Sequence, residues 1–229
     1  MPITVRLRRR NWLRLLGGLI VVAAIIAVAT VYFGGRANPE PPGAVATPTS
    51  SSTADTPLAI DAAPTGCLGG QDRTAEMVLA AQQSAPHTTN GAIEVSTSFM
   101  RWIQRFPFPT PEEAGAVDDS LLAANSFTAD LISYLAGQPD LSGGIVENGT
   151  TYYMSTVPGV WKLETANSDR VEVTVGSAFV IDGALSPTLR SSITVISVWE
   201  DGKWKIADAN GTLTTQDLYA AGRPFLGGC

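Results

Sequence analysis

Side chains that could support catalysis or hold a metal ion are few in this chain and lie far apart. His87 is the only histidine among 229 residues, and it falls between two predicted helices. We interpret it as a solvent-exposed loop residue rather than a catalytic base. Metal sites need clustered His, Cys or carboxylate ligands, and the sequence holds no such cluster with a suitable spacing. It therefore predicts no catalytic residue, metal site or cofactor.

Adjacent carboxylates occur at Glu112-Glu113 and at Asp118-Asp119. Because the helix dipole favours negative charge at a helix N-terminus, we interpret both pairs as charges at helix starts. The sequence also lacks a nucleophile elbow, a phosphate-binding loop and a dinucleotide fingerprint.

A tryptophan flanked by two arginines is the strongest candidate for a partner contact. Arg101, Trp102 and Arg105 fall within one predicted helix, and the arginines share a face away from Phe99 and Phe106. Their guanidinium groups could bind a partner's carboxylate or a lipid headgroup. The alternative is that they are solvated or pair with acidic residues of the same domain.

These residues lie in a region that predicts helices. Asp72 could cap a helix ending near Ser84, and Asn90 a second helix that Pro107 stops. A Thr-Pro-Glu-Glu sequence at 110–113 predicts the start of a third helical region, which reaches residue 137 with a break near residue 115. The second helix has one apolar face, formed by Ala92, Val95, Phe99, Trp102 and Phe106.

From residue 150 onward the apolar period changes to two, which is typical of strands. Strands are expected at 151–157, 160–166, 171–181 and 193–199. Residues 199–204, Trp-Glu-Asp-Gly-Lys-Trp, predict a tight hairpin in which Trp199 lies across from Trp204. Helices followed by strands imply an α+β fold, with helices on one face of an antiparallel sheet.

A charge-free stretch of 19 residues, 15–33, follows five arginines and precedes a Pro/Ser/Thr-rich tract. About 20 apolar residues cross a bilayer core of about 30 Å, and basic flanks stay in the cytoplasm. We therefore expect a cytoplasmic basic tail (1–14), a transmembrane helix (15–33), a disordered exterior linker (34–65) and an exterior domain (66–229). This places the chain in the cell membrane as a single-pass protein with an extracytoplasmic C-terminal domain.

Other interpretations of the apolar stretch are a cleaved secretory signal, a twin-arginine signal and a lipoprotein anchor. The stretch is longer than a usual signal, the nearest small-x-small cleavage site at 35–37 is poor, and no cysteine follows directly. Ala23 and Ala27 could pair two such helices into a homo-oligomer, although an Ala-rich helix contains such pairs by composition alone.

The charge of the domain and the positions of its cysteines limit which partners it could have. The net charge is −6 although the N-terminal tail is basic, so the exterior domain is acidic and nucleic acid is not an expected partner. Cys67 and Cys229 stand at the two ends of that domain. In an oxidising exterior compartment we expect them to form a disulfide, the alternatives being two free thiols or an intermolecular link.

Helices followed by a curved sheet that ends in the hairpin at 199–206 resemble the cystatin-like cone of the nuclear-transport-factor superfamily. The complete order of tail, anchor, tether and domain resembles actinobacterial single-pass envelope proteins. Some of these carry an Arg-Trp-x-x-Arg-Phe/Tyr-Pro segment, here at 101–107. Others are scaffold subunits of conjugation and type IV secretion machines, or membrane proteins that accompany lipid importers. The resemblance supplies no catalytic residue.

Two function classes follow. The first is a membrane-anchored, non-enzymatic interaction or scaffold domain, an accessory subunit of an envelope secretion, conjugation or transport complex. The second is a small-molecule binder, or an isomerase- or dehydratase-like enzyme, that uses the interior of the cone. An enzyme of that kind would place a carboxylate or Tyr in an enclosed pocket. Because the predicted inward strand positions are almost all apolar, we favour the first class.

Overall fold

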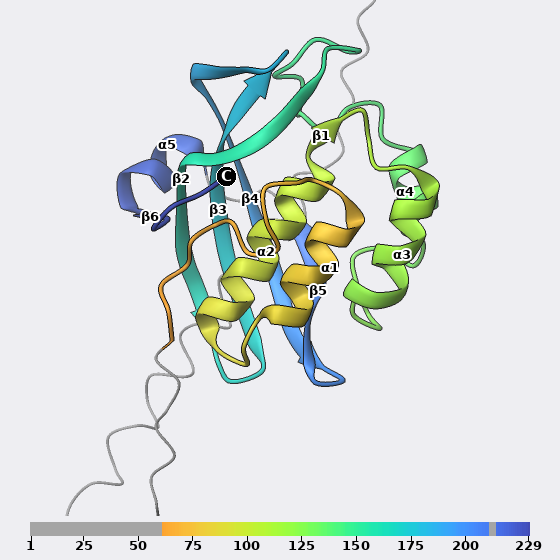
Figure 1. Ribbon diagram of the computed structural model, residues 1–229, viewed down its shortest axis with the longest axis vertical. Coiled ribbons are helices and arrows are strands. Elements are labelled where there is room, and N and C mark those ends of the chain that lie inside the picture. The colour runs from red at the N-terminus through yellow and green to blue at the C-terminus, as the bar shows by residue number, and fades with distance from the viewer. Residues whose placement is uncertain (1–60, 211–213) are drawn as a thin grey trace, which may run out of the picture. The chain divides into compact units, whose positions relative to one another are not determined.

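The computed structural model describes residues 61–210 and 214–229, which form an α+β domain (Figure 1). Its helices pack on a curved antiparallel sheet shaped as a half-barrel, as the sequence predicts at this level. The expected tail, transmembrane helix and nearly all of the expected linker lie outside the described residues. Within the described part of the chain, no helix is both long and apolar enough to cross a membrane.

One sheet contains the six strands of the described residues. Its order is β1-β2-β3-β4-β5, and β6 pairs with the same strand, β2, as β1 does. The strands are β1 (Arg105–Phe106), β2 (Tyr152–Ala166), β3 (Arg170–Ile181), β4 (Ala184–Glu200), β5 (Lys203–Asn210) and β6 (Arg223–Pro224).

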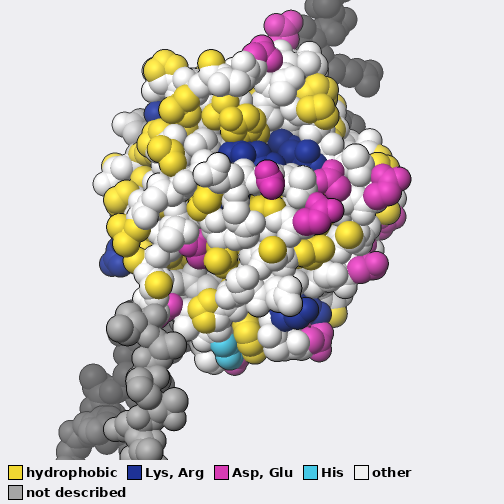
Figure 2. Space-filling view, in the orientation of Figure 1, with side chains coloured by type: hydrophobic (Ala, Val, Ile, Leu, Met, Phe, Trp, Pro, Cys, Tyr) yellow, Lys and Arg dark blue, Asp and Glu magenta, His cyan; other side chains and the backbone are white. Residues whose placement is uncertain are grey.

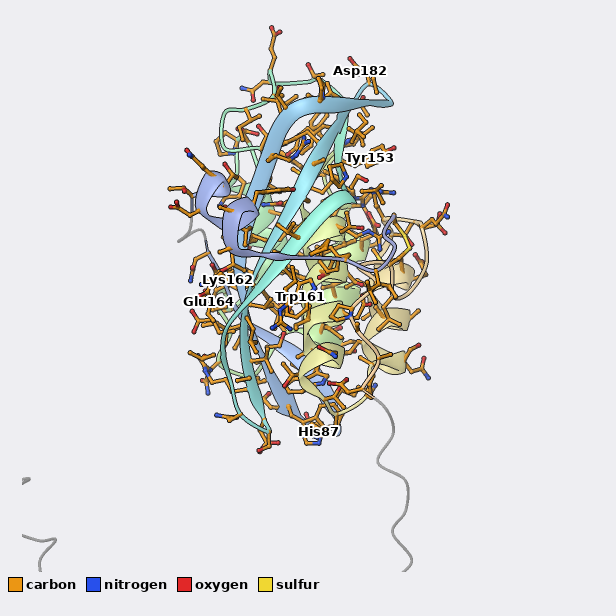
Figure 3. All side chains as sticks on the ribbon, turned by 90° about the vertical axis from the view of Figure 1, so that its left-hand side faces the viewer. His87, Tyr153, Trp161, Lys162, Glu164 and Asp182 are labelled. Carbon is orange, nitrogen blue, oxygen red and sulfur yellow. A yellow bond between two sulfur atoms is a disulfide. The ribbon has the colours of Figure 1, made fainter. Side chains whose placement is uncertain are left out.

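The helices cover the sheet on both faces. Helix α2 crosses the concave face with α1 outside it, whereas α5 packs on the opposite face (Figure 3). Gly176 of β3 permits that second contact, since a Cβ there would lie 2.9 Å from side-chain atoms of Leu218 and Tyr219. The helices are α1 (Ala75–Ser84), α2 (Thr89–Ile103), α3 (Pro111–Leu121), α4 (Leu131–Ala136) and α5 (Thr215–Ala221).

Bulges bend the sheet around α2. The β2–β3 register shifts between Ser155 and Val160, and the β3–β4 register shifts between Ala178 and Val180. An extra residue in one strand bends it and increases its twist. The predicted strands at 151–157 and 160–166 are consequently one strand, β2, which continues through an irregularity.

The core lies between β3 and α2. Val171, Val173 and Val175 alternate along β3 and are fully buried, as the period of two predicts. Along α2, however, every residue from Gly91 to Ile103 is buried, not one face alone. The sheet covers one side of this helix, while α1 and the segment before α1 cover the other.

Each helix start has a local N-cap residue, but two of the predicted cap residues need correction. Thr74 caps α1 and Thr88 caps α2, whereas the sequence suggests Asp72 and Asn90. The start of α3 is confirmed: Thr110 is the N-cap, and it forms a reciprocal capping box with Glu113.

Helix ends differ more from expectation. The third helical region breaks at 122–130 rather than near Gly115, and α2 ends at Ile103, after which Arg105–Phe106 joins the sheet. Asp118-Asp119 therefore lies in the last turns of α3 and not at a helix start. Helix α5 is not predicted.

The hairpin is confirmed. Trp199 pairs with Trp204 across β4 and β5, with ring centroids 5.3 Å apart. Asp201 and Gly202 form the turn with φ values of 53° and 74°. Glycine takes that left-handed conformation without a steric cost, which fixes the register of both strands.

Candidate functional site

The candidate partner residues Arg101 and Trp102 lie inside the domain. Both are fully buried in α2, because α1 and residues 66–72 cover the face that the helical period leaves open. The predicted partner contact is therefore wrong for these two side chains.

Arg101 instead holds the chain that precedes α1. Its Nη2 donates to the carbonyl oxygens of Gly70, at 2.9 Å, and of Asp72, at 3.1 Å. Burial, and after it the charge of Arg73, lower the pKa of Arg101 to about 10, against the opposite effect of Glu94 and Asp72. The guanidinium stays charged at neutral pH, with backbone carbonyls in place of water.

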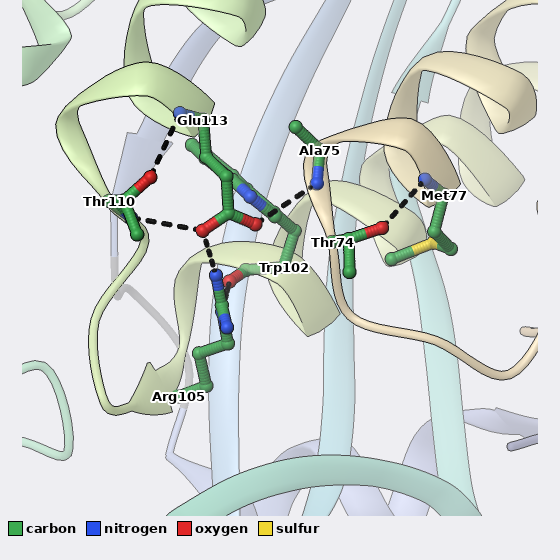
Figure 4. A network of polar contacts seen from close by, with 7 residues as sticks. All are labelled: Thr74, Ala75, Met77, Trp102, Arg105, Thr110 and Glu113. Atoms are coloured by element: carbon green, nitrogen blue, oxygen red, sulfur yellow. Dashed lines mark hydrogen bonds and ion pairs between the residues drawn. The ribbon is translucent and has the colours of Figure 1, made fainter.

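Arg105 forms an ion pair with Glu113. Its Nη2 lies 2.5 Å from Glu113 Oε2, and each of the two side chains is about one-fifth exposed. Glu113 also accepts from the backbone N–H groups of Ala75, at 3.2 Å, and Thr110, at 2.9 Å (Figure 4). One carboxylate thus joins the starts of α1 and α3 to the end of α2. This is the alternative stated above, pairing with an acid of the same domain.

Cys67 and Cys229 form the disulfide that the sequence predicts, with Cα atoms 5.4 Å apart. The C-terminal residue is also held by backbone contacts: Thr156 N–H donates to the Cys229 carbonyl at 2.9 Å, and Cys229 N–H donates to Thr156 Oγ1 at 2.8 Å. Both ends of the domain therefore meet on β2.

The N-terminal boundary of the domain lies slightly before residue 66. The buried Glu94 carboxylate accepts hydrogen bonds from Thr65 N–H, from Thr65 Oγ1 at 2.7 Å and from Gly66 N–H at 3.1 Å. The Pro64 carbonyl accepts from Leu226 N–H at 3.0 Å. Residues 64 and 65, expected in the linker, belong to the folded unit.

His87 is exposed in the α1–α2 loop, as expected, but it is not free. Its ring stacks on Trp199 with centroids 3.9 Å apart, and its Nε2 lies 2.8 Å from the Ser168 carbonyl and 3.0 Å from Asp169 Oδ1. Figure 3 shows it at the end of the sheet opposite Asp182.

Ser168, Asp169 and His87 do not form a catalytic triad. Ser168 Oγ donates to Asp169 Oδ2 at 2.8 Å and not to the imidazole, so the hydroxyl lacks the histidine base that a triad requires. A proton on Nε2 satisfies both oxygen acceptors, which makes this histidine a link between the loop and two hairpins.

A cleft of about 400 Å³ lies where β5 ends at Asn210 and β4 continues past it. Apolar side chains from α2, α4 and their following loops line one side, among them Ile103, Tyr134 and Ile145. Ile145 is 42 % exposed. Arg190 of β4 also lines the cleft, and its guanidinium carbon lies 5.8 Å from the centroid of the Tyr219 ring on α5.

Arg190 is positioned by a bulge in its own strand. Residues 186–189 of β4 lie opposite the single residue Phe179 of β3. The carbonyls of Ser186, Pro187 and Leu189 accept three hydrogen bonds from the Arg190 guanidinium. A guanidinium has five N–H donors, so two are left. No carboxylate in the described part of the chain pairs with it.

The cleft could bind a ligand, but its lining residues include no pair for acid–base catalysis. Among its lining residues, all described, none is Asp, Glu or His; Gln104 accepts from Ser191 Oγ at 3.3 Å, and Tyr134 supplies one phenol. An apolar wall with one unpaired cation suits a ligand that has a carboxylate beside an apolar group.

Charge on the helical face is unevenly distributed. Asp and Glu side chains gather on the side where α3 and α4 lie, with a short band of Lys and Arg beside them (Figure 2). The described residues form no broad basic surface on the face shown in this view. The expectation that nucleic acid is not a partner stays a prediction.

Sequence reasoning missed the cleft. Its residues come from α2, α4, β4, β5 and α5, so no local motif joins them. One signal was present: Pro187 inside an otherwise strand-like segment indicates a bulge. The bulge places Arg190, but the apolar partners across the cleft follow only from the fold.

Comparisons with protein-family models, with curated proteins and with solved structures each found no match to this chain. The function is therefore inferred from the chain's own residues.

Proposed function

We propose that this chain is a single-pass envelope protein whose cystatin-like exterior domain is a non-enzymatic interaction module of a secretion, conjugation or transport complex. The charge-free segment 15–33 behind five arginines supports anchoring with the N-terminus in the cytoplasm. The Pro/Ser/Thr-rich segment after it would act as the tether. Anchoring raises the domain's effective concentration near other membrane proteins.

The cleft at the end of β5 is the observation that carries this proposal. It combines an apolar wall, in which Ile145 is exposed, with Arg190, whose charge no described carboxylate neutralises. It contains no residue pair for general acid–base catalysis. A partner segment with a carboxylate beside apolar side chains would match both features.

A small-molecule binder is the second candidate. The cleft volume of about 400 Å³ falls in the range of about 300 to 1,000 Å³ that is usual for ligand pockets. Tyr134 is the one lining residue that could also serve an isomerase-like reaction.

Site-specific photo-crosslinking in cells would separate these candidates. A crosslinker at Ile145, in the cleft, should form an adduct with an envelope protein, whereas one at Leu163, equally exposed on β2, should not. The Arg190→Gln change should weaken the adduct, and replacement of residues 1–36 by a cleaved signal peptide should abolish it. An adduct that persists in both variants would contradict the proposal, and a small-molecule adduct would favour the second candidate.

Topology needs its own test. Protease added to intact spheroplasts should cut the tether and release a domain that begins near residue 64. Protection of the domain would show that the orientation is reversed or that segment 15–33 is not an anchor.

A further inference from the structure

A second pocket, separate from the cleft, lies between the segment after α2 and the loop that precedes β2. Its volume is about 240 Å³. Its lining includes three aromatic rings and two carboxylates, from Phe106, Phe108, Asp140, Glu147 and Tyr152. No Lys, Arg or His is among the described residues that line it.

The aromatic rings form a corner. Phe106 and Phe108 meet edge to face, with centroids 5.4 Å apart and an interplanar angle of 88°. Tyr152 reaches the same pocket from β2, beside Phe106 in the sheet register. Rings that meet at an angle present π-faces from more than one direction, which is the arrangement that holds organic cations.

The Asp140 carboxylate is held in place by hydrogen bonds, and neither carboxylate has a counter-ion among the described residues. Asp140 accepts hydrogen bonds from the backbone N–H groups of Ser142 and Gly144. Although desolvation opposes it, these bonds keep the pKa of Asp140 below its ordinary value, so the group is ionised. Neither Asp140 nor Glu147 forms an ion pair with any described residue.

The hydroxyl of Tyr152 is a further unexplained group. The residue is 3 % exposed, and its hydroxyl oxygen has no hydrogen-bond partner among the described residues. Burial raises the pKa of Tyr152, and the charge of Asp140 raises it further, so the group stays a neutral phenol that can donate. The oxygen of this unpartnered phenol carries a partial negative charge, which a bound cation would offset.

We propose that this pocket binds a small organic ammonium ion, with the aromatic corner against its alkyl groups and the two carboxylates neutralising its charge. A trimethylammonium head is apolar on its surface and cationic overall, so it matches rings and carboxylates together. A divalent metal fits less well, because the described residues contain no group of three or more His, Cys, Asp or Glu side chains that could hold one. The volume suits a headgroup rather than a drug-sized molecule.

Calorimetric titration of the purified full-length protein in dodecyl maltoside tests this. Choline should bind, and its uncharged isostere 3,3-dimethylbutan-1-ol should bind at least about fivefold more weakly, by the usual strength of cation–π contacts. Glu147→Gln removes one charge at a side chain with no hydrogen bond among the described residues and should weaken choline binding about two- to fivefold, by the usual strength of an exposed ion pair. Asp119→Asn, the matched change on exposed α3, should leave choline binding unchanged.

Phe108→Leu separates the rings from the charges. It should weaken choline binding by a similar factor while the unfolding transition confirms that the variant is folded. Equal binding of choline and the alcohol, an equal loss in Asp119→Asn, or no binding of choline would each overturn the proposal. Glycerophosphocholine binding as tightly as choline would support it and identify a lipid headgroup as the source of the ammonium group.

Discussion

The imidazole of His87 lies flat on the indole of Trp199, with ring planes 7° apart and centroids separated by 3.9 Å. Trp204 meets the same imidazole edge-on at 5.6 Å. The α1–α2 loop is thereby fixed to the β4–β5 hairpin. The chain's single histidine thus has a structural contact, and its polar bonds lead to backbone and carboxylate rather than to a nucleophile.

His87→Ala should lower the free energy of unfolding by about 1 kcal/mol, since it removes a stacked pair and two polar contacts at a partly exposed site. His87→Phe keeps a ring on Trp199 and should lose less. Denaturant titration followed by tryptophan fluorescence measures both. Wild-type stability in His87→Ala would show that the stack contributes nothing.

Glu113→Ala should cost more, about 2 to 3 kcal/mol, because it leaves Arg105 and two backbone N–H groups without their shared acceptor. Glu112→Ala is the matched control in the same turn, where the side chain is exposed, and should change stability by less than about 0.5 kcal/mol. The difference between the two variants is measured by denaturant unfolding. Equal losses would mean that the hydrogen bonds and the ion pair of Glu113 contribute no more than an exposed glutamate in the same turn, and would contradict this assignment.

Features that depend on a few adjacent residues could be predicted from the sequence. The Thr110 capping box and the Trp199–Trp204 hairpin each depend on residues within six positions, and the structure has both. The period of two along β3 also places its buried valines correctly. In each case the determining contacts are local or repeat along one strand.

Features that depend on what covers a surface could not be predicted. The helical period leaves Arg101 on an open face, but residues 66–72 lie over it. His87 contacts residues that follow it by more than 80 positions. Loop closure over such distances leaves no mark in local sequence, and the aromatic pocket around Tyr152 depends on it as well.

Replacing two glycines by alanine should change the free energy of unfolding in opposite directions. At Gly202 an added Cβ meets no atom within 4 Å, so Gly202→Ala isolates the strain of a residue at φ 74° and should cost about 1 to 2 kcal/mol. Gly115 is inside α3, where an added Cβ meets only Ile132 at 3.7 Å, so Gly115→Ala should stabilise by about 0.5 to 1 kcal/mol. Thermal unfolding of both variants gives the signs. A neutral Gly202→Ala would argue against the turn described here.

Tyr219 should make stability fall at alkaline pH. Burial raises its pKa to about 12, against a smaller opposite effect of Arg190, whereas the unfolded chain loses this proton near pH 10. The folded state therefore binds more protons between these values, and the contribution of Tyr219, complete below pH 10, is lost as pH rises toward 12. Between pH 8 and pH 11 the wild type should lose more unfolding free energy than Tyr219→Phe. Parallel losses in the two proteins would contradict this assignment.

The Cys67–Cys229 bond should be the largest single covalent contribution to stability. It joins residues 162 positions apart, and the chain-entropy model gives about 5 kcal/mol for a loop of that length. Cys67→Ser, Cys229→Ser and the double variant should be destabilised equally, since each lacks the same bond, and reduction of the wild type should match them. Non-reducing mass spectrometry of secreted protein should find the two cysteines in one cross-linked peptide. Two alkylatable thiols in native material would contradict the pairing, and unequal single variants would mean that one thiol has a second role.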